Sequence, residues 1–457
     1  MKQTIITTCL FLSAISTFAQ TQDKPVDVKY RRSSLHTMVI ESENFPNKEV
    51  VLKAFNTAPF PEKYNEHTIG QKSFNPVKFT LTSEEKDSVY KPNGKGMLSQ
   101  MASALTTDSV VKEMPYRIQK YFTKEKVANK LVSKWFNRQA DGSFDWNLIA
   151  DRGVFNASFL ETKTAQSSSD GVALLKTAGF ELIGNTFVVV NKFKFYPNEP
   201  VAAIIRDLAK AEVAKSLAGK PQFLLDKSNK GLDAVYEKTK EGYTIIATSY
   251  LYKLVWNDSI SNVFFTEMYM EKGGLDAKKK ALFENTDLFN LEFVGDETAS
   301  SLVTFSLKEK RTEEQVITLS TTRIIDRVYA KLQKKYDVFK TKTPLYTGYP
   351  ITAKIGVKEG LEGGEKFEVL EQNIDEKTGV ATYKSIGTIK VDKNLVWDNT
   401  YTDGQAPAEE VVPEVAENDN GKKGKKGKEK EPKPILDRTT FKGGKKFYSG
   451  LLIKQIK

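Results

Sequence analysis

Two histidines are the first residues to weigh for chemistry in this chain of 457 residues. His36 lies in a strand-like run, "SSLHTMV", and His67 lies in a loop, "YNEHTIG". The members of a Ser-His-Asp triad need not be adjacent in sequence. However, the chain has no Gly-x-Ser-x-Gly elbow and no Ser-x-x-Lys near a Ser-Asp-Asn motif. Two distant histidines also give little support for a metal site. We therefore predict no catalytic, cofactor-binding or metal-ligating residue, and we interpret both histidines as structural or surface residues.

A glycine-rich segment, "AKIGVKEGLEGGEKFEVLEQ" at residues 353–372, is the second candidate for chemistry. A phosphate-binding loop needs a fixed glycine register and a helix N-terminus that points at the phosphate. Here the glycines precede the alternating run 367–370, which is typical of a strand, and no Gly-Lys-Ser/Thr follows. The pattern instead predicts a hairpin between 351–357 and 367–370, with positive φ at the glycines, and a third strand at 387–391.

A family resemblance is carried by the segment "IGVKEGLEGGEKFEVLEQNIDEKTGVATYKSIGTIKV". It resembles the small C-terminal β-barrel of flagellar H/T-ring accessory proteins, and related modules occur in envelope proteins near the curli-secretion lipoprotein family. The positions that fit that pattern are Gly356, Gly360, Leu361, Gly364, Phe367, Val369, Thr378, Gly379, Gly387, Ile389 and Val391. Glu365 stands where the family usually has Asp. The resemblance covers about 346–457 and implies a barrel used in assembly and binding rather than in catalysis.

The first nineteen residues predict an export signal. Lys2 precedes an apolar stretch from Ile5 to Phe18, and Ala19 fits the cleavage pattern, so the mature chain should begin at Gln20. Cys9, the single cysteine, lies inside this signal. The mature protein would therefore have no disulfide, no thiolate nucleophile and no cysteine zinc site. No later apolar run is long enough to predict a transmembrane helix.

These features predict an exported protein of the periplasm or of the outer-membrane periphery. The signal and the Gln that follows the cut are similar to those of secreted proteins of the Bacteroidetes group. Three Asp-Ser-aliphatic tripeptides resemble the O-glycosylation acceptor of exported proteins in that group. Their candidate acceptors are Ser88, Ser109 and Ser259.

Hydrophobic patterning predicts a multi-domain α+β protein. After the signal, 1–19, come an N-terminal α+β region at 20–122 and a layered α/β or α+β domain at 123–343, in which helices and strands alternate. Residues 344–457 should form a small all-β barrel with a disordered insert at 403–436.

The elements that we expect to position any site follow from local patterns. They are a strand at 35–40, a helix beginning at Thr123, strands at 187–190 and 243–256, a helix at 200–218, and a long helix capped by Thr312 and Gln315. The helix at 200–218 carries an apolar stripe of Val201, Ile204, Ile205, Leu208, Val213 and Leu217.

The formal net charge of +11 raises the question of nucleic acid. Lysines cluster at 422–433, inside the insert, and acidic residues precede them at 403–419. This cluster has no aromatic residues to stack on bases. An anionic glycan or a lipopolysaccharide phosphate is an alternative ligand, but the composition favours a solvated loop. We predict no nucleic-acid partner.

Together these observations predict a non-enzymatic cell-envelope protein that acts as a scaffold or binding module, with envelope proteins or glycan as partners. The alternative is a secreted hydrolase acting on glycan or peptide, with catalytic groups spread through the middle domain. A pocket that gathers two carboxylates, or His36 beside a serine, would favour the hydrolase. A closed, packed middle domain with an exposed patch would favour the binding protein.

Overall fold

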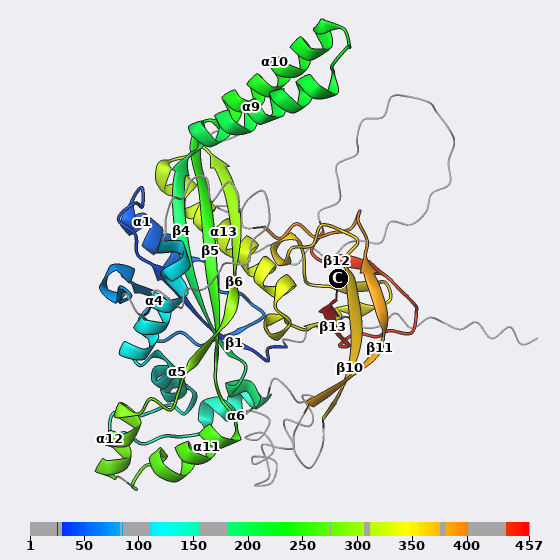
Figure 1. Ribbon diagram of the computed structural model, residues 1–457. Helices are drawn as coiled ribbons and strands as arrows, with labels where there is room; N and C mark the ends of the chain where they lie inside the picture. Colours follow the sequence, from blue (N-terminus) through cyan, green and yellow to red (C-terminus); the bar gives the residue numbers. More distant parts are fainter. Residues whose placement is uncertain are drawn as a thin grey trace, which may run out of the picture.

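The computed structural model describes residues 30–82, 110–154, 181–274, 276–305, 311–374, 381–400 and 436–456, with Pro25 and Glu85. These residues form two sheets with helices, so the α+β class is confirmed (Figure 1). The predicted cleavage site at Ala19 and Gln20, the candidate acceptors Ser88 and Ser109, and nearly all of the insert at 403–436 lie outside the described residues.

The first sheet has the strand order β2-β1-β4-β5-β6, and β3 also pairs with β1. Its strands are β1 (Ser34–Ile40), β2 (Asn65–Glu66), β3 (Ser73–Phe74), β4 (Thr186–Pro197), β5 (Gly242–Leu254) and β6 (Leu291–Thr304). β1 runs parallel to β2, β3 and β4, whereas β4, β5 and β6 are antiparallel. Because β1 lies between β2 and β4, the segments 20–122 and 123–343 contribute to one sheet.

Helices cover both faces of this sheet (Figure 1). Phe187 and Val189 of β4 pack with α1 (Lys48–Thr57) and α13 (Glu313–Lys335), whereas Val188 and Val190 face the opposite layer. That layer contains α4 (Val110–Lys124), α5 (Val127–Trp135), α6 (Asn147–Val154), α11 (Asp258–Val263) and α12 (Ala277–Asn285). Burial on both faces explains why β4 reads as a continuous apolar run.

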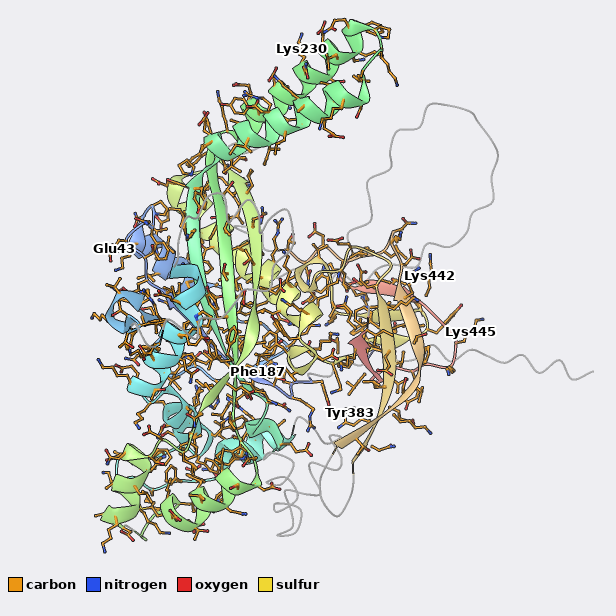
Figure 2. All side chains as sticks on the ribbon, viewed as in Figure 1. Glu43, Phe187, Lys230, Tyr383, Lys442 and Lys445 are labelled. Atoms are coloured by element: carbon orange, nitrogen blue, oxygen red, sulfur yellow. The ribbon has the colours of Figure 1, made fainter. Side chains whose placement is uncertain are left out.

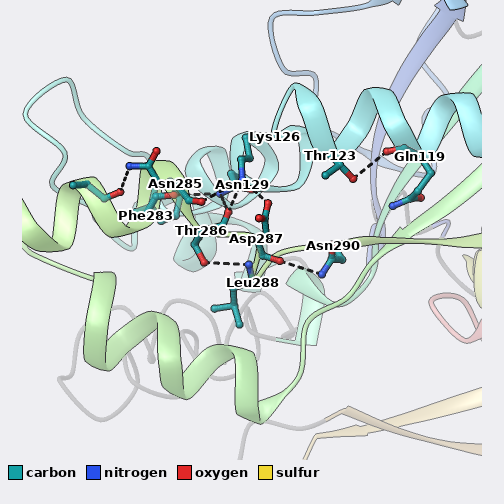
Figure 3. Close-up of polar contacts among 11 residues, drawn as sticks. Gln119, Thr123, Lys126, Asn129, Phe283, Asn285, Thr286, Asp287, Leu288 and Asn290 are labelled. Carbon is teal, nitrogen blue, oxygen red and sulfur yellow. Dashed lines mark hydrogen bonds and ion pairs between the residues drawn. The ribbon is translucent and has the colours of Figure 1, made fainter. Parts of the chain in front are cut away.

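A break between α4 and α5 corrects the expected helix start at Thr123. Thr123 lies in the last turn of α4, and its Oγ1 donates to the carbonyl of Gln119 at 3.2 Å. The chain reverses at Lys126, which has a φ of 51°. The Lys126 Nζ reaches the carbonyl of Thr286 at 3.2 Å and Asp287 Oδ1 at 2.5 Å, which ties α5 to the segment after α12 (Figure 3).

The second sheet has seven antiparallel strands and is curled into a half-barrel. Its order is β7-β13-β10-β11-β12-β9-β8. The strands are β7 (Thr343–Pro344), β8 (Thr347–Gly348), β9 (Ile351–Ala353), β10 (Lys366–Ile374), β11 (Ala381–Val391), β12 (Thr439–Lys442) and β13 (Leu452–Gln455). Its core includes Leu345, Val369, Ile389 and Phe441.

The predicted hairpin between 351–357 and 367–370 is wrong. β9 pairs with β8 and β12, whereas β10 pairs with β11 and β13. The glycines do take positive φ, with 79° at Gly360, 104° at Gly363 and 102° at Gly364. They reverse the chain without pairing the two strands that flank them. The strand predicted at 387–391 lies within β11.

The last strand, β13, lies between β10 and β7 in this sheet. Leu452 and Ile453 are buried, at 3% and 1% exposure, whereas Ile456 is 45% exposed. Only part of this segment is therefore buried on both sides.

Two helices connect β4 to β5: α9 (Asn198–Ser216) and α10 (Gln222–Thr239). We call them the helical arm, because they stand off the end of the first sheet (Figures 1 and 2). The expected stripe of α9 splits, since Val201 is buried while Ile204, Ile205 and Leu208 are exposed. Among the described helices, none combines the length and apolarity that a membrane span requires.

Candidate anion-binding pocket

His36 is fully buried in β1. Its two ring nitrogens have no hydrogen-bond partner among the described residues. Burial lowers the pKa of His36 to about 3, and the charges of Lys134 and Lys72 add to this effect. The imidazole is therefore neutral at physiological pH and is out of reach of a substrate.

His67 is also fully buried, and its hydrogen bonds define its role. The Nε2 lies 2.9 Å from the carbonyl of Leu131, and the Nδ1 lies 2.7 Å from Nη1 of Arg152. Since guanidinium nitrogens only donate, Nδ1 accepts and Nε2 carries the proton. The same Nη1 lies 2.9 Å from Ser34 Oγ. Arg152 thus occupies the lone pair that His67 would need to act as a base toward Ser34.

The guanidinium of Arg152 completes this buried cation cluster, which consists of Arg152, His67, Ser34 and Trp135. Its Nη2 donates to the carbonyl of Glu66 at 2.8 Å, and its Cζ lies 4.4 Å from the ring centroid of Trp135. Burial lowers the pKa of Arg152 to about 10, so the charge persists at neutral pH. The cation is stabilised by neutral acceptors and an indole face, which indicates a structural role.

The other candidate residues are placed as follows. In the described part of the chain, no group of three or more His, Cys, Asp and Glu side chains could hold a metal ion. Ser259 is exposed in the first turn of α11, so this candidate glycan acceptor is accessible.

A pocket of about 120 Å³ lies where the residues before β1, the residues after α13 and β13 meet. We call it the basic pocket. Its lining consists of Tyr30, Arg32, Ser33, Lys63, Asn185, Asp337, Val338, Lys340, Thr341, Lys342 and Lys454. Five of these side chains are cationic and one is a carboxylate. Cavities of ~150 Å³ hold a molecule the size of benzene, so this volume suits a small anion.

Arg32 forms the wall on the side of the first sheet. It comes just before β1, and its side chain is only 11% exposed. The Nη2 lies 2.5 Å from Glu181 Oε2. The guanidinium also interacts with the hydroxyls of Tyr30 and Tyr383, while its buried Nη1 has no hydrogen-bond partner within the described residues. A buried N–H group without a partner costs free energy, so a ligand atom that accepts its hydrogen bond would be bound favourably.

Lys340 is positioned by the turn that follows α13. Phe339 is fully buried and stacks on Tyr64 with ring centroids 4.9 Å apart, which anchors the turn. The Lys340 Nζ lies 2.6 Å from Asp337 Oδ1. Lys340 first, and then Lys454, lowers the pKa of Asp337. This pair neutralises one of the five cations.

Lys342 lies against an aromatic ring in the basic pocket. Its Nζ lies 4.0 Å from the ring centroid of Tyr383, whose hydroxyl hydrogen-bonds with that of Tyr30. Burial lowers the pKa of Lys342 to about 8, and the charges of Arg32 and Lys454 lower it further. Burial and nearby like charges both disfavour the protonated lysine, and a bound anion would favour it.

Lys63 lines the edge of the pocket nearest the second sheet. Its Nζ donates to Thr343 Oγ1 at 2.9 Å. Burial lowers its pKa, against the opposing influence of Glu359 and Glu62. Lys63 also lines a smaller neighbouring pocket of about 30 Å³, in which Glu359 is the carboxylate.

Sequence reasoning missed the basic pocket, because its residues come from separate segments at 30–33, 63, 185, 337–342 and 454. The only local sign was the alternation of Lys340 and Lys342 in "KTKTP". A comparison of the chain with protein-family models gave no match, and a comparison with curated proteins gave none.

Proposed function

We propose that the protein is a non-enzymatic binding protein of the cell envelope, and that it holds an anionic group in the basic pocket. The observation that carries this proposal is the convergence of Arg32, Lys63, Lys340, Lys342 and Lys454 around one cavity with a single carboxylate. The residues of the pocket offer many hydrogen-bond donors. This composition suits binding of a sulphate, phosphate or carboxylate group.

The position of the pocket supports a scaffold role for such binding. Arg32 and Asn185 come just before β1 and β4 of the first sheet, Lys454 lies in β13 of the second, and Lys340 and Lys342 lie on the connection between the sheets. An anion in the pocket would contact both sheets at once. The export signal predicted at residues 1–19 supports a location in the cell envelope. The proposed ligand is an anionic glycan or an acidic side chain of an envelope protein.

The hydrolase alternative gains no support from the described residues. It requires two carboxylates in one pocket, or a histidine beside a serine. The basic pocket contains Asp337 alone, and the smaller neighbouring pocket contains Glu359 alone. The lone pair of His67 that would serve Ser34 is taken by Arg152.

Calorimetric titration with sulphate tests the proposal. We expect the wild type to bind one sulphate, and the double variant Lys342→Gln/Lys454→Gln to bind it at least tenfold more weakly. The control is Lys384→Gln/Lys390→Gln, which changes two exposed lysines of β11 and should leave the affinity unchanged. Equal affinities in the pocket and control variants would show that sulphate responds only to overall charge, and the proposal would fail.

A further inference from the structure

The helical arm is not required by the topology of the first sheet. β4 and β5 are antiparallel neighbours, and Pro197 at the end of β4 pairs with Tyr243 at the start of β5. Two residues suffice to connect strands in this arrangement. The chain instead inserts residues 198–241 and builds two helices that project from the sheet (Figure 1). Because the sheet does not need these helices to connect β4 and β5, we look for a role of the arm other than packing against the sheet.

The base of the arm is fixed to the sheet. Asn198 is fully buried, and its Nδ2 donates to the carbonyl of Val303 at 3.0 Å and to that of Glu241 at 3.2 Å. Its Oδ1 accepts from Thr244 Oγ1 at 2.8 Å. At Gly242, with a φ of 120°, a Cβ atom would lie 2.1 Å from the carbonyl oxygen of Val303. The arm therefore leaves the sheet in a defined direction.

Polar and cation–π contacts join the two helices, and apolar side chains such as Val213, Leu217 and Leu232 are half-buried. Lys210 Nζ lies 2.6 Å from Asp233 Oδ1, and the guanidinium of Arg206 lies 4.5 Å from the ring centroid of Tyr236. No residue of α10 is buried. Five large apolar side chains face solvent, with exposures between 42% and 65%: Ile204, Ile205, Leu208, Phe223 and Val235.

Charge is distributed unevenly along the arm. The tip, residues 215–230, carries Lys215, Lys220, Lys227 and Lys230 against Asp226 alone. Figure 2 labels Lys230 on α10. The base of the arm is acidic, with Glu199, Asp207, Glu212, Asp233, Glu237 and Glu241 against Arg206, Lys210, Lys238 and Lys240. The tip also carries Phe223, the most exposed aromatic side chain of the arm, at 65%.

We propose that the tip of the helical arm docks on an anionic lipid surface. Phe223 enters the interface between headgroups and acyl chains, and the lysines of the tip contact the headgroups. The coincidence of an exposed aromatic ring with a surplus of lysines at the end of a projecting element favours this occupant. The charge of the tip complements an anionic headgroup layer, whereas the acidic base stays away from it. This site is independent of the basic pocket.

Vesicle sedimentation tests the proposal with the mature chain from Gln20. Vesicles of phosphatidylcholine with phosphatidylglycerol are compared with vesicles of phosphatidylcholine alone, and the wild type should bind only the former. Each lysine near an anionic surface strengthens binding roughly fivefold. Lys220→Gln/Lys227→Gln/Lys230→Gln should therefore weaken binding about 100-fold, and Phe223→Ser should weaken it severalfold.

Two controls separate the arm from general surface properties. Lys384→Gln/Lys390→Gln/Lys393→Gln removes three exposed lysines from the second sheet and its following turn, and Val77→Ser removes an apolar side chain that is 69% exposed elsewhere. Neither control should change vesicle binding. Failure of the wild type to bind, or equal weakening by the arm and control variants, would overturn the proposal. So would self-association in analytical ultracentrifugation that Phe223→Ser abolishes without any vesicle binding, because the arm would then be a protein contact.

Discussion

The buried cation cluster and the basic pocket both contain positively charged side chains, but they differ in the hydrogen-bond acceptors that the protein provides for them. Arg152 is 6% exposed and donates to the carbonyl of Glu66, to His67 and to Ser34. In the basic pocket, Arg32 keeps a buried Nη1 without a partner in the described structure, and Lys342 lies among like charges with its pKa lowered to about 8. The first site holds its cation with acceptors of the protein, whereas the second has more donors than acceptors.

This difference distinguishes a buried cation that stabilises the fold from cations that we propose to bind a ligand. A buried cation is tolerated when hydrogen bonds replace its hydration. The cluster around Arg152 meets that condition within the protein. In the basic pocket, the proposed anion would supply the further acceptors, and the cavity of about 120 Å³ provides the room for it. Removing charge should therefore damage the fold at the first site and ligand binding at the second.

The largest effect should come from Arg152→Met. The substitution removes the donor to His67 Nδ1, to Ser34 Oγ and to the carbonyl of Glu66, all in a buried environment. We expect the free energy of unfolding to fall by about 3 kcal/mol or more. Urea denaturation measures this, and sulphate affinity under folding conditions should not change. A decrease in the free energy of unfolding of less than ~1 kcal/mol would contradict the structural role of the cluster, because the cluster would then not be needed for stability.

A pH effect on sulphate affinity should come next in size. Binding of an anion favours the protonated form of Lys342, whose pKa in the free protein is about 8. Below pH 8 the lysine is already mostly charged, so the affinity should be constant. Above pH 8 it should fall by up to about tenfold per pH unit until the lysine pKa of the complex is reached.

Sulphate is the suitable probe because its own charge does not change in this range. Calorimetric titrations between pH 6 and pH 10 measure the effect, with Lys342→Gln as the control that should lose it. A profile that stays flat through pH 9 in the wild type would remove Lys342 from the site.

A smaller gain should follow Asp337→Asn. Asp337 is the single carboxylate of the basic pocket, and it pairs with Lys340 at 2.6 Å. Because Asp337 is 75% exposed, the pair is weak, and releasing Lys340 should strengthen sulphate binding about threefold to fivefold. Asp437→Asn, at a carboxylate paired with Arg438 just before β12, is the matched control and should change little. Weaker binding after Asp337→Asn would mean that the carboxylate positions the ligand.

The smallest effect should come from shortening the helical arm. Replacing residues 204–235 by a short Gly-Ser turn removes no buried residue, since the buried positions of α9 are Asn198, Val201 and Ala202 and α10 has none. We expect the free energy of unfolding to change by less than about 1 kcal/mol, as for other surface changes. Sulphate binding should be unchanged. A large loss of stability would show that the arm supports the sheet rather than serving as a contact surface.

Local signals predicted much of the fold. The Thr312 side chain and Gln315 form the capping box that begins α13. The run at 187–190 lies in β4, and the run predicted at 243–256 matches β5 up to Leu254. These succeeded because capping and strand propensity depend on near neighbours. The hairpin between 351–357 and 367–370 failed because positive φ at Gly360, Gly363 and Gly364 specifies a reversal but not the partner strand. That partner, β12, arrives from residues 439–442.

The two surfaces proposed for function lay beyond sequence reasoning for different reasons. The basic pocket depends on contacts between Arg32, Lys342 and Lys454, which are far apart in the chain. The exposure of Ile204, Ile205 and Leu208 was misjudged because an apolar stripe predicts which face of a helix is buried only if another layer covers that face. The arm projects from the sheet, so the base of α9 alone is buried.

The most direct test of the binding claim is a crystal structure of the protein soaked with selenate, located by anomalous scattering from selenium. The account predicts a peak inside the basic pocket, within hydrogen-bond distance of Arg32 Nη1 and of the Lys342 or Lys454 Nζ. The peak should be absent in the Lys342→Gln/Lys454→Gln variant under the same soak. An empty pocket with selenate bound only at exposed lysines would contradict the account.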